Sequence, residues 1–97
     1  MNVLTITQLN NLIKRTLDRE YLLKNVYVSG TIINAKRHSS GHMYFSLKDE
    51  ASAIDVTMWS STVMQKGLAN AIQNGLLVTV KASVNFYNKM GRLNLIA

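Results

Sequence analysis

The spacing of apolar residues constrains this chain most, because it changes twice within residues 26–97. Apolar and polar residues alternate in five segments, as they do in strands with one buried face. These segments span residues 26–34, 43–48, 53–59, 76–87 and 92–97. Between the third and the fourth, apolar residues recur at helical spacing, at Val63, Met64, Leu68, Ala71 and Ile72. The sequence thus predicts three strands, a helix and two further strands.

An additional helix is predicted before the first strand, where Leu9, Leu12, Ile13 and Leu17 recur at helical spacing. Thr7 is its expected N-cap, and it should end between Glu20 and Lys24. For the later helix, Ser60 or Ser61 is the expected cap, and Gly75 suits the left-handed position after its end. Gly30, inside the first strand, predicts a bulge or a sharp bend.

Three strands, a helix and two strands is the element order of the OB-fold, a five-stranded Greek-key barrel. We therefore predict a mostly β protein with this fold, carrying an N-terminal helix and a helix between strands three and four. Residues 1–24 would be a helical extension and residues 25–97 the OB-fold domain. A chain of 97 residues with 47% hydrophobic residues fits one packed domain.

Several classes of protein fit the composition poorly. The chain has no cysteine, so disulfides and thiolate zinc sites are excluded and a cytoplasmic location is compatible. Its first 15 residues lack the continuous apolar stretch of a signal peptide. No apolar run reaches the roughly 18 residues of a membrane-spanning helix. We expect a cytoplasmic protein with no membrane partner.

The charge favours a polyanionic partner, since 11 basic residues face 5 acidic ones. OB-folds bind ligands on the face of strands two and three, framed by the loops that join strands 1–2 and 4–5. The predicted loops, 35–42 and 87–92, contain no acidic residue and carry Lys36, Arg37, Lys89 and Arg92. Of the five carboxylates, Asp55 alone is predicted near this face.

Aromatic residues accompany the positive charge. Tyr44 and Trp59 are predicted on the outward face together with Ser46, Lys48 and Thr57, and His38, His42 and Tyr87 lie in or beside the loops. A positive groove with aromatic platforms holds single strands without reading their sequence. The alternative for Trp59 is packing on the following helix.

The loop before strand two has its own candidates. Gly41 would allow close approach of the backbone to a phosphate, and Ser40 would bond phosphate oxygens with its hydroxyl. An ordinary loop glycine and polar loop serines are the alternative.

No catalytic residue, metal site or cofactor is predicted in this chain. His38 and His42 are its only histidines, whereas a catalytic zinc needs three protein ligands. Asp49, Glu50 and Asp55 are its only clustered carboxylates, and a pair in a turn beside a lysine is usually structural.

Residues 36–50, KRHSSGHMYFSLKDE, carry a specific resemblance. The chain resembles the N-terminal OB-fold domain of the exodeoxyribonuclease VII large subunit over all 97 residues. The matching positions here are Ser40, Gly41, His42, Tyr44, Phe45, Leu47, Lys48 and Asp49, with Tyr87 and Gly91 further on. In NKMGR the proline common in the family is missing, Leu93 replaces an aromatic residue, and Trp59 stands where phenylalanine is usual.

The resemblance implies single-stranded DNA as the ligand and a parent enzyme that cleaves it from either end into oligonucleotides. That enzyme acts with many copies of a small subunit, and its catalytic region lies outside these residues. Another nucleic-acid OB module, of the tRNA anticodon-binding type, stays an alternative. So does an oligomerisation module, in which an exposed edge of the fifth strand pairs with another copy.

Overall fold

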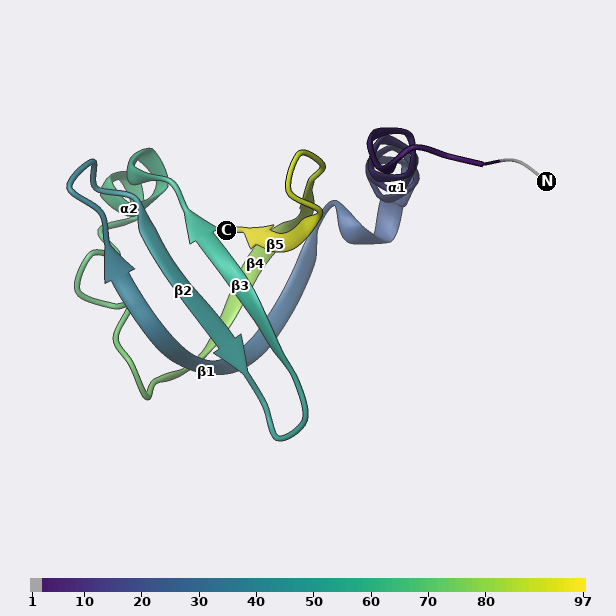
Figure 1. The fold of residues 1–97 in the computed structure, drawn as a ribbon. Helices are drawn as coiled ribbons and strands as arrows, with labels where there is room; N and C mark the ends of the chain where they lie inside the picture. Colours follow the sequence, from purple (N-terminus) through teal and green to yellow (C-terminus); the bar gives the residue numbers. More distant parts are fainter. Residues whose placement is uncertain (1–2) are drawn as a thin grey trace.

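A computed structural model describes residues 3–97 of the chain (Figure 1). Its elements are α1 (Ile6–Arg19), the 3-10 helix η1 (Tyr21–Leu23), β1 (Val26–Arg37), β2 (Met43–Lys48), β3 (Ala53–Met58), α2 (Ser60–Lys66), β4 (Leu77–Tyr87) and β5 (Arg92–Ile96). The element order agrees with the one predicted from the spacing of apolar residues, and the OB-fold is confirmed.

The five strands close into a barrel in the order β1-β2-β3-β5-β4. β1 is long and curved, so that its first half pairs with β4 and its second half with β2 (Figure 1). β5 lies antiparallel to β4 and parallel to β3. β5 pairs with β4 along its whole length and with β3 at Leu95 and Ile96. The edge expected to be exposed along the fifth strand is therefore limited to the residues before Leu95.

Gly30 was predicted to mark a bulge or a sharp bend. β1 keeps a regular register with β4 through Gly30, so no bulge is found there, while the strand as a whole is curved (Figure 1). A Cβ atom at Gly30 would lie 3.0 Å from the Lys48 carbonyl oxygen, so β2 can approach only a glycine this closely. The irregularity lies between Ile33 and Lys36, where the register with β2 shifts and Asn34 has φ 54°. β1 then continues to Arg37, three residues beyond the predicted end.

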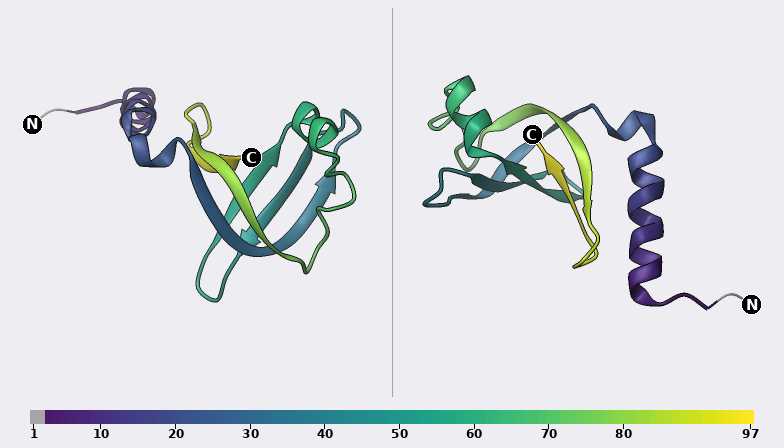
Figure 2. Two further views of the ribbon diagram at one scale, coloured as in Figure 1. Left: turned by 180° about the vertical axis from the view of Figure 1, so that it is seen from behind. Right: turned by 90° about the horizontal axis from the view of Figure 1, so that it is seen from above.

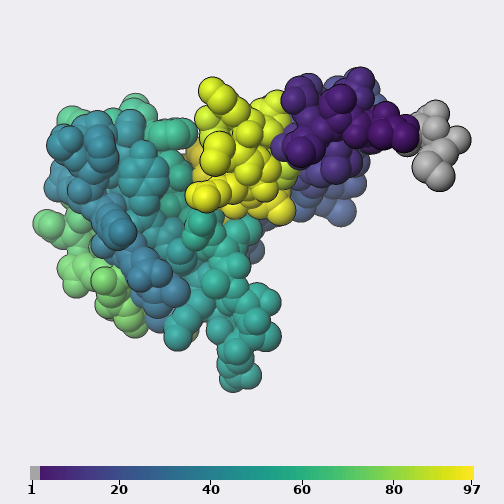
Figure 3. All heavy atoms as spheres, in the orientation of Figure 1, coloured from purple at the N-terminus to yellow at the C-terminus, as the bar shows by residue number. Residues whose placement is uncertain are grey.

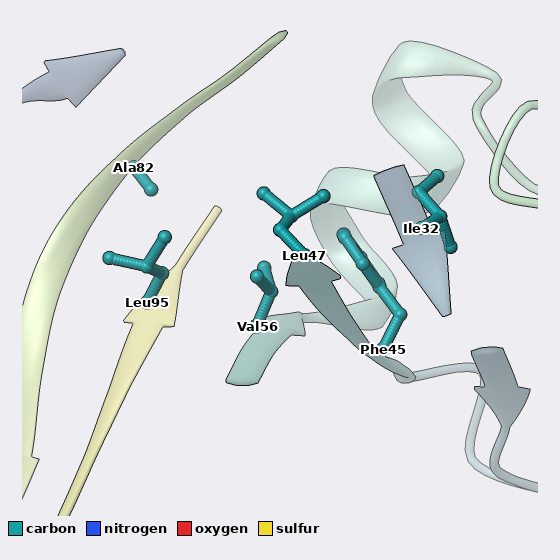
Figure 4. Close-up of a cluster of buried hydrophobic side chains, with 6 residues drawn as sticks. All are labelled: Ile32, Phe45, Leu47, Val56, Ala82 and Leu95. Carbon is teal, nitrogen blue, oxygen red and sulfur yellow. The ribbon is translucent and has the colours of Figure 1, made fainter. Parts of the chain in front are cut away.

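Inward-facing residues of all five strands form the core. Figure 4 shows Ile32, Phe45, Leu47, Val56, Ala82 and Leu95 pointing toward one another inside the barrel. In β1, β2 and β4 these residues occupy the apolar faces predicted from the alternation, so the predicted faces of these three strands are confirmed. A smaller cluster of Met43, Met58 and Val63 lies beneath α2.

α1 is attached to the barrel at its side (Figure 2). It begins two residues earlier than predicted: Thr5, not Thr7, is the N-cap, and Thr5 and Gln8 form a capping box. The helix has no buried residue, and Leu9 and Leu12 are each 45% exposed. The apolar face predicted from the spacing therefore exists but is only partly covered.

α2 is shorter than predicted, and neither expected cap is used. Trp59 precedes it without a side-chain capping bond, and the helix ends at Gly67 in the left-handed conformation. Leu68 and Ile72 follow in turns, where they still pack against the core beneath α2. Gly75 is left-handed, with φ 89°, but it ends this irregular segment rather than a helix.

Within residues 3–97, no helix has both the length and the apolar character needed to cross a bilayer.

Candidate nucleic-acid interface

A groove of about 710 Å³ lies on the outer face of β2, β3 and β5. Its lining includes two cations, three exposed aromatic side chains and a set of polar groups: Lys36, Arg92, Tyr44, Trp59, Tyr87, Asn34, Ser46, Thr57, Asn85, Asn94 and Asp55. The remaining lining residues are apolar: Phe45, Val56, Leu93 and Ile96. This is the face on which OB-folds bind oligonucleotides and oligosaccharides.

Strand pairing brings these side chains onto one face. Tyr44 lies opposite Lys36 of β1 on one side and opposite Thr57 of β3 on the other. Tyr87 and Arg92 lie opposite each other where β4 turns into β5. The two cations therefore border the groove from β1 and from β5, with the aromatic residues between and beside them.

A row of hydrogen bonds joins β4, β5 and β3 across the groove. The Asn85 amide donates to Asn94 Oδ1 at 3.0 Å, and the Asn94 amide donates to Thr57 Oγ1 at 3.1 Å. Thr57 was expected to be exposed, yet it is buried, with 7% of its surface accessible. The neighbouring β5 covers Thr57 in the closed barrel, and Asn94 satisfies its hydroxyl.

Two aromatic residues hold defined positions in the groove. Tyr44 is 39% exposed and Trp59 is 43% exposed. The Trp59 ring meets the His42 ring edge-on, with centroids 5.0 Å apart and planes at 77°. Trp59 thus faces the groove rather than being covered by α2, and His42 supports it from the side.

The loop from His38 to His42 is held by its own hydrogen bonds. The backbone N–H of His38 donates to the His42 carbonyl at 2.9 Å, and that of Gly41 donates to the His38 carbonyl at 2.8 Å. The Ser40 backbone N–H also donates to His38 Nδ1, and the same ring nitrogen lies 2.8 Å from Ser40 Oγ. The loop is therefore a closed turn.

The same loop contacts the first turn of α2. The Ser60 backbone N–H donates to His42 Nδ1 at 2.8 Å, and a Cβ atom at Gly41 would lie 3.2 Å from Ser60 Cβ. His42 thus satisfies the first amide of α2, a helix that neither expected serine caps. A contact of Gly41 or His42 with nucleic acid stays a prediction beside this structural role.

Not all of the predicted residues meet in the groove. Lys36, Tyr44, Trp59, Tyr87 and Arg92 line it together. Arg37, Lys48 and Lys89 are exposed but do not line it, and neither do His38 and Ser40 of the loop. Lys36 and Arg37 were expected in a loop, but they belong to β1, which continues past its irregularity.

Polar residues of β4 and β5 were missed in the sequence. Asn85 lines the groove from β4, for which only the apolar face was predicted, and Asn94 lines it from β5, for which no face was predicted. Asparagine is depleted in strands. The presence of Asn85 in β4 and of Asn94 in β5 was therefore a sequence signal that these two strands share a polar outer face.

Asp49, one of the clustered carboxylates considered as catalytic candidates, stabilises the turn between β2 and β3. Its Oδ1 accepts the backbone N–H groups of Ala51 and Ser52, each at 2.9 Å. These two hydrogen bonds hold the pKa of Asp49 below its usual value. Within residues 3–97, no three His, Cys, Asp or Glu side chains gather closely enough to hold a metal ion.

A family model and the similar proteins of known name agree on the family of this chain. A family model described as an OB-fold nucleic acid binding domain matches residues 4–97. The exodeoxyribonuclease 7 large subunit of Clostridium acetobutylicum is 45% identical over 95 residues, which are 98% of this chain and 23% of that protein. The subunit of Clostridium kluyveri is 42% identical over 91 residues, 94% of this chain and 22% of that protein. The chain thus spans about a quarter of the length of these relatives.

Solved structures share the fold at low sequence identity. A replication protein A heterotrimer bound to ssDNA aligns with a TM-score of 0.60 and 19% identity, covering 76% of this chain and 52% of the other. A putative aspartyl-tRNA synthetase from Leishmania major aligns with a TM-score of 0.62 and 14% identity, covering 84% of this chain and 18% of the other. At these identities the likeness concerns the fold alone.

Proposed function

Because this chain belongs to the family of OB-fold nucleic acid binding domains, we propose that its groove binds single-stranded DNA. The observation that carries the proposal is that Tyr44 and Trp59, both partly exposed, lie in one groove with Lys36 and Arg92. Bases of a single strand can stack on the aromatic rings while its phosphates meet the cations, and neither contact requires a particular sequence.

The relatives support a DNA ligand and a place in a larger enzyme. Their name, exodeoxyribonuclease 7 large subunit, denotes a deoxyribonuclease. We propose that this chain is the DNA-capturing domain, residues 25–97 preceded by a helical extension, of such a subunit. Degradation of DNA to oligonucleotides would then take place outside these residues, with a small subunit as partner. A DNA ligand also supports a cytoplasmic location.

The remaining predicted residues complete the proposed interface. Arg37, Lys48 and Lys89 would contact phosphates next to the groove, and His38, Ser40, Gly41 and His42 would do so from the loop. Because the groove is lined by Lys36 and Arg92, these two should matter more than the outer cations. RNA binding of the tRNA anticodon type is the second candidate, and competition with structured RNA separates the two.

The first test is a titration of the 97-residue chain with a fluorescently labelled oligonucleotide at several salt concentrations. We expect binding at low salt, and log K should fall with log salt by about 0.7 per neutralised phosphate. Absence of binding at low salt, or an affinity that ignores salt, would contradict the proposed function. Light scattering in the same buffers reports any self-association of the chain.

Stacking is tested with Tyr44→Ala and Trp59→Ala. Each should weaken binding by about 1–3 kcal/mol, the usual value of stacking one base on an aromatic ring. Tyr27→Ala is the matched control, because Tyr27 is 71% exposed on β1 and does not line the groove. Equal losses in all three variants would mean that the groove is not the binding surface.

A further inference from the structure

One carboxylate lies in a groove whose proposed ligand is a polyanion. Asp55 is exposed on β3 and lines the groove together with Tyr44 and Trp59. A carboxylate there repels phosphates at short range, so it weakens binding to DNA unless it meets a hydrogen-bond donor of the ligand.

Asp55 is oriented by a neighbouring side chain. Ser46, its direct partner on β2, donates from Oγ to Asp55 Oδ1 at 2.8 Å. This bond uses one lone pair of one carboxylate oxygen, so the second oxygen and the remaining lone pairs are available to the groove.

Among the described residues, Asp55 has no cation as a partner and, unlike Asp49 and Glu20, accepts no backbone N–H group of its own turn. The one ion pair within residues 3–97 joins Lys14 to Asp18 on α1. Asp49 accepts two backbone amides of its turn, and Glu20 accepts the backbone N–H of Leu22. No basic side chain in this described part of the chain comes within 4 Å of the Asp55 carboxylate, so its charge remains available to a donor of the ligand.

The donors that single-stranded DNA presents are on base edges. Guanine places N1–H and N2–H₂ side by side on its Watson–Crick edge, and these two donors match the two oxygens of a carboxylate. Cytosine and adenine each offer one amino group, whereas thymine offers a single N–H between two carbonyl oxygens, which a carboxylate repels. Unstacked bases of single strands expose these edges to protein side chains.

Resting on the proposed function, we infer that Asp55 gives the groove a preference for guanine over thymine. A base stacked on Tyr44 or Trp59 would present its edge to Asp55, and Ser46 would hold the carboxylate in place. The groove would then combine sequence-independent stacking and phosphate contacts with one position that reads a base.

The experiment compares two oligonucleotides, a thymidine 12-mer and the same strand with two separated guanines at its centre. The unmodified 97-residue chain should bind the guanine-containing strand about 10-fold more tightly, toward the lower end of the discrimination given by a bidentate side-chain–base pair. A strand with two adenines at the same positions shows how much of the gain comes from purine stacking. Inosine, which lacks the N2 amino group, should give an intermediate affinity.

Asp55→Asn should abolish the preference for guanine over adenine and strengthen binding to the thymidine strand, because a negative charge is removed. Glu50→Gln is the matched control: it removes the same charge in the β2–β3 turn, outside the groove, and should leave the preference unchanged. Circular dichroism melting confirms that both variants are folded.

Failure of the inference and failure of the proposed function give different results. If the unmodified chain binds neither oligonucleotide, the proposed function is wrong. If it binds the thymidine strand and the guanine-containing strand equally, DNA binding stands and the role of Asp55 is refuted. The same conclusion follows if the preference for guanine over adenine survives in Asp55→Asn.

Discussion

Asp49 closes the turn between β2 and β3 with its own side chain. Its carboxylate accepts the N–H groups of Ala51 and Ser52, while its backbone N–H donates to the Ser52 carbonyl at 3.0 Å. A carboxylate that accepts hydrogen bonds from backbone N–H groups two and three residues later stabilises a turn of the chain. The side chain that looks most like a catalytic acid thus serves to start β3 in the correct register.

This role has a pH dependence with a definite sign. The two amides lower the pKa of Asp49 in the folded state, so their stabilisation is fully present above the unfolded pKa of about 3.9. It is lost as pH falls through the lower, folded pKa. We expect amide exchange at Ala51 and Ser52 to accelerate in Asp49→Ala at pH 6, and that variant to lose less stability than the unmodified chain on acidification.

Glu50→Ala is the control, because the structure gives Glu50 no hydrogen bond in residues 3–97 that corresponds to those of Asp49. Hydrogen exchange measured by NMR at pH 6 reports both variants. Unchanged exchange at Ala51 and Ser52 in Asp49→Ala would contradict the structural role of this side chain.

At the scale of elements, α1 contacts the barrel through asparagines at the β4–β5 turn. Asn10 Nδ2 donates to the Asn88 carbonyl at 2.9 Å, and Asn88 Nδ2 donates to Asn11 Oδ1 at 2.7 Å. Figure 3 shows the β4–β5 region between the rest of the barrel and the helix. The turn expected to frame the ligand face is therefore also the place where the N-terminal helix is attached.

We expect the double variant Asn10→Ala and Asn11→Ala to release α1 from the barrel. Each lost hydrogen bond contributes about 0.5–1.5 kcal/mol, so amide protection in α1 should fall while that of the strands stays unchanged. Alanine raises the intrinsic helix propensity at both positions, so a loss of protection would come from the lost attachment. Arg15→Ala, on the same helix, is the control and should retain protection.

The strands were predictable and the ends of the helices were not. β2 was predicted at its observed bounds because each of its six residues obeys the alternation. α2 was extended too far because Leu68 and Ile72 have helical spacing, although they cover the core from irregular turns. Thr5 was missed although Gln8 stands three residues later, which is the sequence signature of a capping box.

The candidate site was predictable only in part. Alternation identified Tyr44 and Trp59 as outward residues, because one strand suffices to define a face. The bonds between Asn85, Asn94 and Thr57 join three strands, and such contacts depend on barrel closure rather than on local pattern. For the same reason, the contacts of His42 with Ser60 and Trp59 could not be predicted from the local sequence pattern.

For the whole molecule, stability depends on closing the barrel at β5. Leu95 is 1% exposed and lies opposite Val56 of β3 and Val84 of β4. We expect Leu95→Ala to cost about 2–5 kcal/mol, as buried leucines do when a cavity is left. That loss would lower the melting temperature by roughly 4–8 °C per kcal/mol in a domain of this size.

Leu93→Ala provides the matched control on the same strand. Leu93 is 49% exposed, and substitutions at such surface positions usually change stability by less than about 0.5 kcal/mol. Thermal melts followed by circular dichroism compare the two variants. Similar melting temperatures would show that β5 contributes little to the stability of the barrel.

The position of β5 between β3 and β4 also matters while the protein is being made. β5 leaves the ribosome after the two strands that it joins, so a nascent chain ending at Tyr87 already contains four strands of an open sheet. In that chain, backbone groups of β3 and of the second half of β4 have no partner, and such edges pair readily with other chains. The barrel therefore closes only once β5 has been made, and a nascent chain stalled before Arg92 is the species most prone to aggregate.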